Sequence, residues 1–175
     1  MTRGLVRITD EETPILQGLA ADVPENGIII EIGSAWGYSI SKMAEVSKRS
    51  VTLFAIDPWT LGGQKQQPAR ERQFREITAP YKNIRKIKAF SQDVDWKVEI
   101  DLLFIDGNHQ YNFVSGDYLK FSPFVKKDGI LVFHDYLEER APGVTRAVAE
   151  FVIPSGLWDW HTQERFWIGR RRENV

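Results

Sequence analysis

Two apolar runs that each end in charged side chains constrain the fold of this chain more than any other feature. The first is DLLFIDGNH, residues 101–109, and the second is GILVFHD, residues 129–135. Strands this apolar are typical of a parallel sheet that is covered on both faces. Open α/β sheets bind ligands outside the carboxyl ends of their strands, so we expect the polar ends of both runs to meet in one crevice. The residues expected there are Asp106, His109, His134 and Asp135.

The composition is typical of a soluble globular protein. The chain has 175 residues, 42% of them hydrophobic and 27% charged, which suits a single domain over residues 1–175. A net charge of −1 gives no general attraction to nucleic acid or to a membrane surface. The absence of cysteine excludes disulfides, a thiolate nucleophile and cysteine-bound zinc. No apolar run resembles a signal core or a membrane span, so we expect a cytoplasmic protein.

Strand and helix patterns alternate along the chain. Strands are expected at residues 27–34, 51–57, 101–106 and 129–135, the last after a turn at Asp128-Gly129, and a strand nearer the sheet edge from Ile84. Helices are expected to begin at Trp36, Ala69, Tyr111 and Val144, with a loop over residues 58–68. Two closing antiparallel strands are expected at residues 157–161 and 165–170. This order predicts an α/β fold with a doubly wound, mostly parallel sheet and helices on both faces.

The N-terminal segment has the pattern of a helix start. Thr9 is followed three residues later by Glu12, which is the form of a capping box. A short helix should therefore run to about Ala21, before Pro24 and Gly27 break the chain. We interpret residues 1–26 as an N-terminal helical cover.

The first strand runs into EIGSAWGYS, residues 31–39. Gly33 allows close backbone approach in the turn, and Gly37 opens the next helix, whose free N–H groups favour a carboxylate or a phosphate. The spacing is that of neither the dinucleotide fingerprint nor the P-loop. By itself this motif is equally well explained as a tight strand-to-helix turn.

Two further strand ends suggest a nucleoside pocket. Asp57 ends the second strand and can accept both hydroxyls of a ribose, although a helix cap would explain it as well. Ser91 and Gln92 follow the third strand and can hydrogen-bond an adenine edge, while Ser91 alone would suit a helix N-cap. Trp36 and Trp59 lie on the same expected loops, where they would either wall a ligand or pack internally.

The polar strand ends also suggest chemistry. Asp106 and Asp135 are hard oxygen ligands suited to Mg²⁺ or a similar divalent cation. His134 would either ligate or point the opposite way into the sheet. His109 titrates near neutrality and is the natural general base.

Five segments, taken in order, resemble the motifs of class I S-adenosylmethionine-dependent methyltransferases. They are EIGSAWGYS, FAID, FSQD, FIDGNH and VFHD, between Gly27 and Tyr136. The resemblance is closest to the Mg²⁺-dependent small-molecule O-methyltransferases, such as catechol O-methyltransferase and the macrolide-sugar and cephalosporin-cluster group. It implies a Rossmann-like, doubly wound seven-stranded sheet that ends in a C-terminal antiparallel strand pair.

The resemblance also implies a role for each motif. The methionyl part of the cofactor would contact Glu31, Gly33, Ser34 and Gly37, and the ribose would contact Asp57, with Trp36, Pro58 and Trp59 beside it. The adenine would contact Ser91 and Gln92. The metal would be held by Asp106, His134 and Asp135, with Asp106 also beside the cofactor and His109 as catalytic base. His134 departs from the pattern, because these relatives tend to carry a carboxylate there, and an imidazole weakens the preference for hard cations.

The activity implied is methyl transfer from S-adenosylmethionine to a hydroxyl of a small molecule, assisted by a divalent metal. Two alternatives remain open at this point: a cofactor-binding module without turnover, and a metal-dependent hydrolase. The expected partner is a small hydroxylated acceptor, not nucleic acid or a membrane. The acceptor's identity and a homo-oligomeric state are left open. Because the chain is short and lacks an inserted lid, a partner subunit or the N-terminal segment would have to shape the acceptor pocket.

Overall fold

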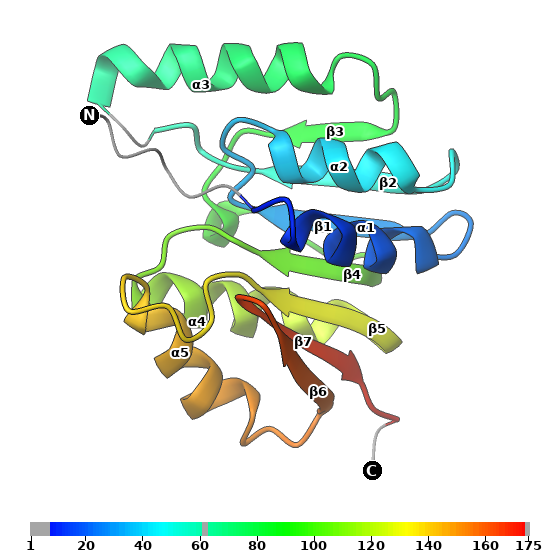
Figure 1. Ribbon diagram of the computed structural model, residues 1–175, viewed down its shortest axis with the longest axis vertical. Helices are drawn as coiled ribbons and strands as arrows, with labels where there is room; N and C mark the ends of the chain where they lie inside the picture. The colour runs from blue at the N-terminus through cyan, green and yellow to red at the C-terminus, as the bar shows by residue number, and fades with distance from the viewer. Residues whose placement is uncertain (1–7, 61–62, 174–175) are drawn as a thin grey trace.

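The computed structural model describes residues 8–60 and 63–173, and a seven-stranded sheet forms its centre (Figure 1). The strands are β1 (Ile28–Ile32), β2 (Thr52–Ile56), β3 (Ile84–Ile87), β4 (Ile100–Ile105), β5 (Val125–Phe133), β6 (Trp158–Gln163) and β7 (Phe166–Arg171). They lie in the order β3-β2-β1-β4-β5-β7-β6. The first five are parallel, and β7 pairs antiparallel with both β5 and β6. The predicted fold class is confirmed, and the strand from Ile84 lies at the sheet edge.

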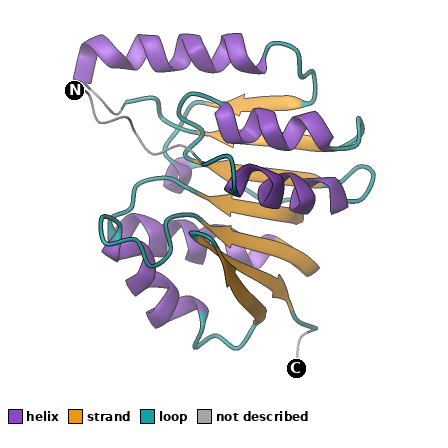
Figure 2. Ribbon diagram, viewed as in Figure 1, coloured by secondary structure: helices purple, strands orange, loops and turns teal. Residues whose placement is uncertain are grey.

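Helices cover both faces of the sheet (Figure 2). They are α1 (Glu12–Asp22), α2 (Tyr38–Val46), α3 (Gly63–Thr78), α4 (Tyr111–Phe121) and α5 (Pro142–Ala147), with short turns η1 (Ser91–Asp93), η2 (Ser122–Phe124) and η3 (Val148–Val152). Apolar residues of α1 and α2 share one buried cluster with the sheet, and those of α4 and α5 share another. Within the described residues, no helix has the length and apolarity needed to cross a bilayer.

Side-chain alternation along the central strands feeds these two clusters. Ile29 of β1 and Leu102 of β4 face α1 and α2, whereas Ile30 and Leu103 face α4 and α5. The same alternation in β5 directs Ile130 and Val132 toward the α1 side. Alternate residues of a strand therefore point to opposite faces of the sheet. The same alternation determines the side of the sheet on which His134 lies, as described below.

The predicted capping box at the start of α1 is present. The Thr9 N–H donates to Glu12 Oε2 at 2.7 Å, and the Glu12 N–H donates to Thr9 Oγ1 at 3.2 Å. The helix ends at Asp22, close to the predicted end at Ala21. These two bonds fix the Glu12 carboxylate as well as the helix terminus.

Several element boundaries differ from the prediction, and α2 begins at Tyr38 rather than at Trp36. Helix α3 begins at Gly63 rather than Ala69 and has Pro68 inside it, because the Gln and Lys residues before the proline favour helix. Strand β5 is continuous through Asp128, whose φ of 61° fits a bulge opposite β4 rather than a separating turn. Helix α5 begins at Pro142 rather than Val144, since proline suits a first helical turn. The expected loop's residues 61–62 lie outside the described residues.

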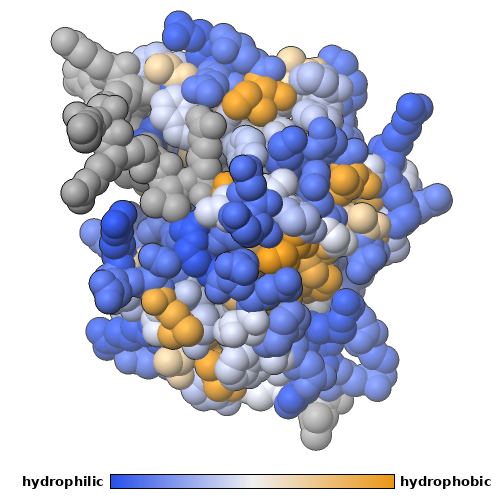
Figure 3. All heavy atoms as spheres, in the orientation of Figure 1, coloured by the Kyte–Doolittle hydropathy of each residue, from blue (hydrophilic) through white to orange (hydrophobic). Residues whose placement is uncertain are grey.

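One stretch of the sheet lacks a helix on the α1 side. Beside α1, strands β5, β7 and β6 show their face in Figure 1, and apolar atoms reach the surface there in Figure 3. A cavity of 320 Å³ lies over this face, lined by Leu19, Ile130, Trp160 and Ile168 among others. It lies away from the carboxyl ends of the parallel strands, where the candidate site is found.

Candidate active site

A cavity of about 800 Å³ opens at the carboxyl ends of β1, β2 and β4. This is the edge at which open α/β sheets bind ligands. Many of the residues selected from the sequence line it: Gly33, Ser34, Trp36, Asp57, Pro58, Ser91, Asp106, His109 and Asp135. The selected residues that do not line it are Glu31, Gly37, Trp59, Gln92 and His134, of which all but Gln92 are buried.

The turn between β1 and α2 requires glycine. Gly33 has a φ of +95°, and a Cβ placed there would lie 2.2 Å from the backbone oxygen of Asp106. Gly37 has a φ of +84°, and its Cβ would lie 2.9 Å from the ring of Phe74 on α3. The first glycine lets the ends of β1 and β4 approach, and the second lets α3 pack against the start of α2.

Glu31 lies fully buried beneath this turn. The Ser39 hydroxyl donates to its Oε1, whereas its Oε2 has no hydrogen-bond partner among the described residues. Burial raises the pKa of Glu31 to about 7. A buried oxygen without a donor is costly, so a ligand ammonium or hydroxyl in the cavity would be favoured here.

Asp57 is held by the two loops beside it. Its Oδ2 accepts from the Ala35 N–H at 2.9 Å and its Oδ1 accepts from the Trp59 N–H at 2.5 Å. Each oxygen keeps a further lone pair for a ligand. Burial raises the pKa of the Asp57 carboxyl.

The two loop tryptophans have different surroundings. Trp59 is 2% exposed, donates from its Nε1 to Ala35 O at 2.7 Å and packs edge-on against Phe74. Trp36 instead lines the cavity, with the Arg70 guanidinium 5.3 Å from its ring centre. Of the two, Trp36 has the position of a ligand-walling residue, and Trp59 has that of a packing residue.

Arg70 is a cavity residue that sequence reasoning missed. It is 7% exposed, and its Nε has no hydrogen-bond partner among the described residues. The surrounding segment is rich in charge and was expected to form an exposed helix. Nothing in its local pattern distinguishes Arg70 from the exposed Arg72 nearby.

The Ser91-Gln92 segment forms the short helix η1. The Ser91 hydroxyl donates to Asp117 Oδ1 on α4 and does not cap η1. Gln92 lies against Gly116, where an added Cβ would come within 2.5 Å of its amide nitrogen. Burial raises the pKa of Asp117 to about 6. Ser91 thus reaches the cavity, while Gln92 is exposed and does not line it.

His109 lies at the cavity opening between two carboxylates. Its Nε2 is 3.3 Å from Asp135 Oδ2 and 3.7 Å from Asp106 Oδ1, and its side chain is 39% exposed. The interaction with Asp106 raises the pKa of His109, with a smaller contribution from Asp135 and against the opposing effect of burial. The geometry suits a base that exchanges protons with a ligand.

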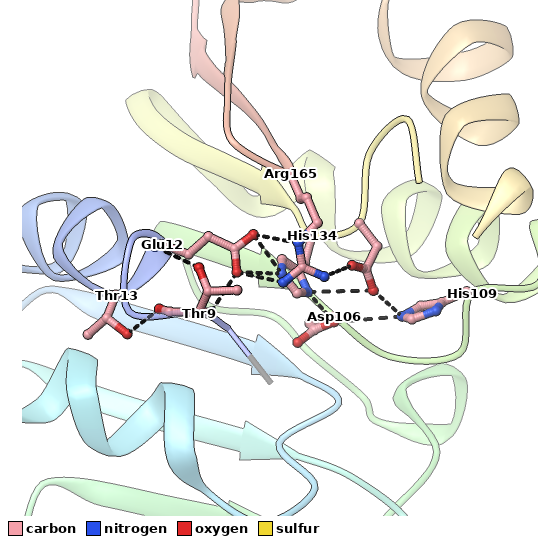
Figure 4. Close-up of polar contacts among 8 residues, drawn as sticks. Thr9, Glu12, Thr13, Asp106, His109, His134 and Arg165 are labelled. Carbon is pink, nitrogen blue, oxygen red and sulfur yellow. Dashed lines mark hydrogen bonds and ion pairs between the residues drawn. The ribbon is translucent and has the colours of Figure 1, made fainter. Parts of the chain in front are cut away.

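His134 is buried completely, on the α1 side of the sheet (Figure 4). Its Nδ1 is 3.0 Å from Asp106 Oδ1, and its Nε2 is 3.3 Å from both carboxylate oxygens of Glu12. Strand alternation explains this position, because His134 continues the series of Ile130 and Val132. Burial lowers its pKa, but the negative charge of Asp106 and the bonds to Asp106 and Glu12 outweigh that effect and raise the pKa to about 10.

Arg165, from the turn between β6 and β7, completes this cluster (Figure 4). Its Nε and Nη2 donate to the two oxygens of Glu12 at 2.8 and 2.7 Å, and its Nη1 donates to Asp135 Oδ1 at 2.6 Å. Burial opposes ionisation of Glu12, but the bonds from His134 and Arg165 lower its pKa to about 2. Sequence reasoning missed Arg165 and gave Glu12 only a capping role, because they lie at opposite ends of the chain.

The proposed metal ligands are close enough together but have other partners. Ligand atoms of Asp106, His134 and Asp135 lie within 4.8 Å of one another. However, both ring nitrogens of His134 face carboxylates, and a protonated imidazole offers no lone pair to a metal. Asp135 is already paired with a guanidinium. With these partners in place the donor set does not fit a divalent metal, and the ligand role expected for His134 stays a prediction.

One family model and one curated relative match this chain. Residues 30–136 match the model of a family described as a methyltransferase domain. The uncharacterized protein R132 of Acanthamoeba polyphaga mimivirus is 34% identical over 147 residues, covering 79% of this chain and 65% of that protein. The chain thus spans somewhat less than two thirds of the length of this curated relative.

Several solved structures share the fold at low sequence identity. The O-methyltransferase NovP superimposes with a TM-score of 0.76 at 16% identity, covering 93% of this chain and 80% of that one. A Bacillus cereus O-methyltransferase in complex with SAH gives 0.73 at 13% identity, covering 95% and 83%. A putative rRNA methylase from Clostridium thermocellum gives 0.70 at 11% identity, covering 95% and 100%. At these identities the likeness establishes the fold alone, which is the Rossmann-like methyltransferase fold.

Proposed function

The chain belongs to the methyltransferase-domain family, and from that premise we propose that it transfers the methyl group of S-adenosylmethionine to a hydroxyl of a small molecule. The observation that carries this proposal is the position of His109. Its imidazole lies at the opening of the large cavity, within 3.3 Å of Asp135 and 3.7 Å of Asp106. A base at this point would reach an acceptor hydroxyl beside the cofactor.

The cavity suits the cofactor at both ends. Asp57 would accept the ribose hydroxyls with its remaining lone pairs, and Ser91 would lie near the adenine. Glu31, fully buried behind the cavity lining, would attract the ammonium of the methionyl group through its negative charge. S-adenosylmethionine supplies a methyl group bonded to a positively charged sulfur.

The proposed chemistry needs one proton transfer and one substitution. The neutral imidazole of His109 accepts the acceptor's hydroxyl proton while the acceptor oxygen attacks the methyl carbon in line. The carbon–oxygen bond forms as the carbon–sulfur bond breaks, and the electron pair of that bond stays on sulfur. Asp106 and Asp135 stabilise the imidazolium that results. The rate would come mainly from positioning and electrostatics.

A small acceptor is favoured over nucleic acid by the charge of the chain. Its net charge is −1, so there is no basic excess to bind a phosphate backbone. Because putative rRNA methylases share the fold, the test should include RNA beside small hydroxylated compounds. A cofactor-binding module without turnover remains the competing function.

The test combines cofactor binding with methyl transfer. Calorimetric titration with S-adenosylmethionine should show binding that Asp57→Ala weakens strongly. Transfer of labelled methyl groups to a panel of phenols, sugars and RNA should then identify the acceptor class. His109→Gln should abolish turnover and leave cofactor affinity nearly unchanged.

The control is His161→Gln, which changes the exposed histidine of β6 outside the large cavity. Absence of cofactor binding in the unaltered protein would refute the methyltransferase proposal. Binding without transfer to any acceptor would favour the cofactor-binding module. Turnover that survives His109→Gln would refute the assignment of the base.

A further inference from the structure

Three carboxylates converge beside the reaction centre, and the chain itself supplies cations to them. Glu12, Asp106 and Asp135 are all contacted by the pair Arg165 and His134 (Figure 4). Uncompensated carboxylates this close together would repel one another strongly. A divalent metal is one means of holding such a set, and fixed side-chain cations are another.

Arg165 is bound more firmly than a surface arginine. It contacts both oxygens of Glu12 in the forked geometry that guanidinium groups favour, and its third contact is to Asp135. Its side chain is 18% exposed and lines the cavity. A metal that recruited Asp135 would have to compete with this guanidinium for the same carboxylate.

Glu12 is also fixed from behind. Its Oε2 accepts from the Thr9 backbone as part of the capping box, so the N-terminal helix presents the carboxylate to Arg165 and His134. The start of α1 therefore fixes the position of the carboxylate that Arg165 and His134 contact. The charge that relatives are expected to offset with a bound ion is here offset by Arg165 and His134.

We propose that Arg165 occupies the place of the divalent cation in this site, supported by His134, and that the protein holds and methylates its acceptor without a metal ion. The catalytic clause rests on the proposed function, whereas the statement about metal binding does not. The geometry that supports the proposal is the position of the Arg165 guanidinium, which contacts Glu12 and Asp135 at 2.6–2.8 Å.

The experiment uses Mn²⁺, whose free aqueous form is measured by electron paramagnetic resonance, as a stand-in for Mg²⁺. When Mn²⁺ is added at millimolar concentration to the unaltered full chain, the signal of free Mn²⁺ should be undiminished. The variant Arg165→Met removes the resident cation, and Mn²⁺ should then raise its melting temperature. The matched control Arg172→Met removes an exposed arginine that pairs with Asp159 on β6, and Mn²⁺ should leave its melting temperature unchanged.

Each outcome decides the proposal. One Mn²⁺ bound per unaltered chain, and lost in Asp135→Asn, would overturn it. Mn²⁺ that leaves Arg165→Met unaffected would show that Arg165 does not stand in the cation's place. If Arg165→Met fails to fold, the result with the unaltered chain still decides. Cofactor binding measured on the same preparation is independent of Mn²⁺, so failure of the methyltransferase proposal would be recognised separately.

Discussion

His109 and His134 are the same amino acid in opposite surroundings. Both contact Asp106, but the first is 39% exposed at the cavity opening and the second is fully buried behind it. Burial against Glu12 keeps the His134 proton inside an ion pair, where no ligand reaches it. His109 is therefore the histidine that can exchange a proton with an acceptor.

The first prediction concerns the pH dependence of turnover. A base must be neutral to accept a proton, and the neighbouring carboxylates raise the pKa of His109 above its ordinary 6.5. We expect kcat/KM to fall toward acid pH with a midpoint above 6.5. In Asp135→Asn the midpoint should shift to lower pH, because one carboxylate that stabilises the imidazolium is lost. A midpoint at or below 6.5 in the unaltered protein would contradict the assignment.

The second prediction concerns Arg70, a buried cation that borders the cavity and stacks on Trp36. Its unpartnered Nε is suited to an anionic group such as the carboxylate of the cofactor. Arg70→Gln should weaken S-adenosylmethionine binding about 10-fold, the loss typical of one charge-assisted hydrogen bond. Arg72→Gln, on the exposed side of the same helix, is the control and should bind as before. Equal affinities in both variants would refute this role.

At the scale of elements, α1 and the β6–β7 turn are joined through the site. The same Glu12 carboxylate caps α1 and binds Arg165. Local sequence pattern predicted the first role, because a capping box needs only residues three apart. The second role depends on a contact across nearly the whole chain, which no local pattern encodes.

The third prediction tests the contact between Glu12 on α1 and Arg165 in the β6–β7 turn. Glu12→Gln would leave the Arg165 and His134 cations without their shared partner in a buried place. We expect a loss of about 3–5 kcal/mol in the free energy of unfolding, measured by urea titration. Glu11→Gln changes the exposed neighbour and should cost far less. Similar losses in the two variants would mean that the ion pairs contribute little.

At the scale of the whole molecule, the order of the strands in the sheet determines where the candidate site lies. Strands β1, β4 and β5 are neighbours, so the polar residues after them meet although they are far apart in the sequence. Strand β7 lies next to β5 and brings Arg165 to the same edge. The N-terminal and C-terminal parts of the described chain therefore meet at the candidate site.

The fourth prediction is the pH dependence of stability. The pKa of His134 is raised from 6.5 to about 10 by folding, so its contribution is complete below pH 6.5 and is lost as the pH rises toward 10. The pKa of Glu12 is lowered from 4.5 to about 2, so its contribution is complete above pH 4.5 and is lost as the pH falls toward 2. Melting temperatures should therefore be highest between pH 4.5 and pH 6.5, where both contributions are complete. In His134→Gln the alkaline decline should be much smaller, and an unchanged decline would contradict the ion pair.

The sequence by itself determined the fold class, the strand ends that form the cavity, and the motifs at Gly33, Asp57 and Asp106. These features depend on short-range periodicity and on the rule that parallel strands end at one edge, both of which are legible in the residues. Only the tertiary structure decided that His134 faces Glu12 and that Arg165 bridges Glu12 and Asp135. Such ion pairs depend on which distant elements become neighbours and on which face each side chain leaves its strand. Long-range packing therefore determined the charge balance of the site.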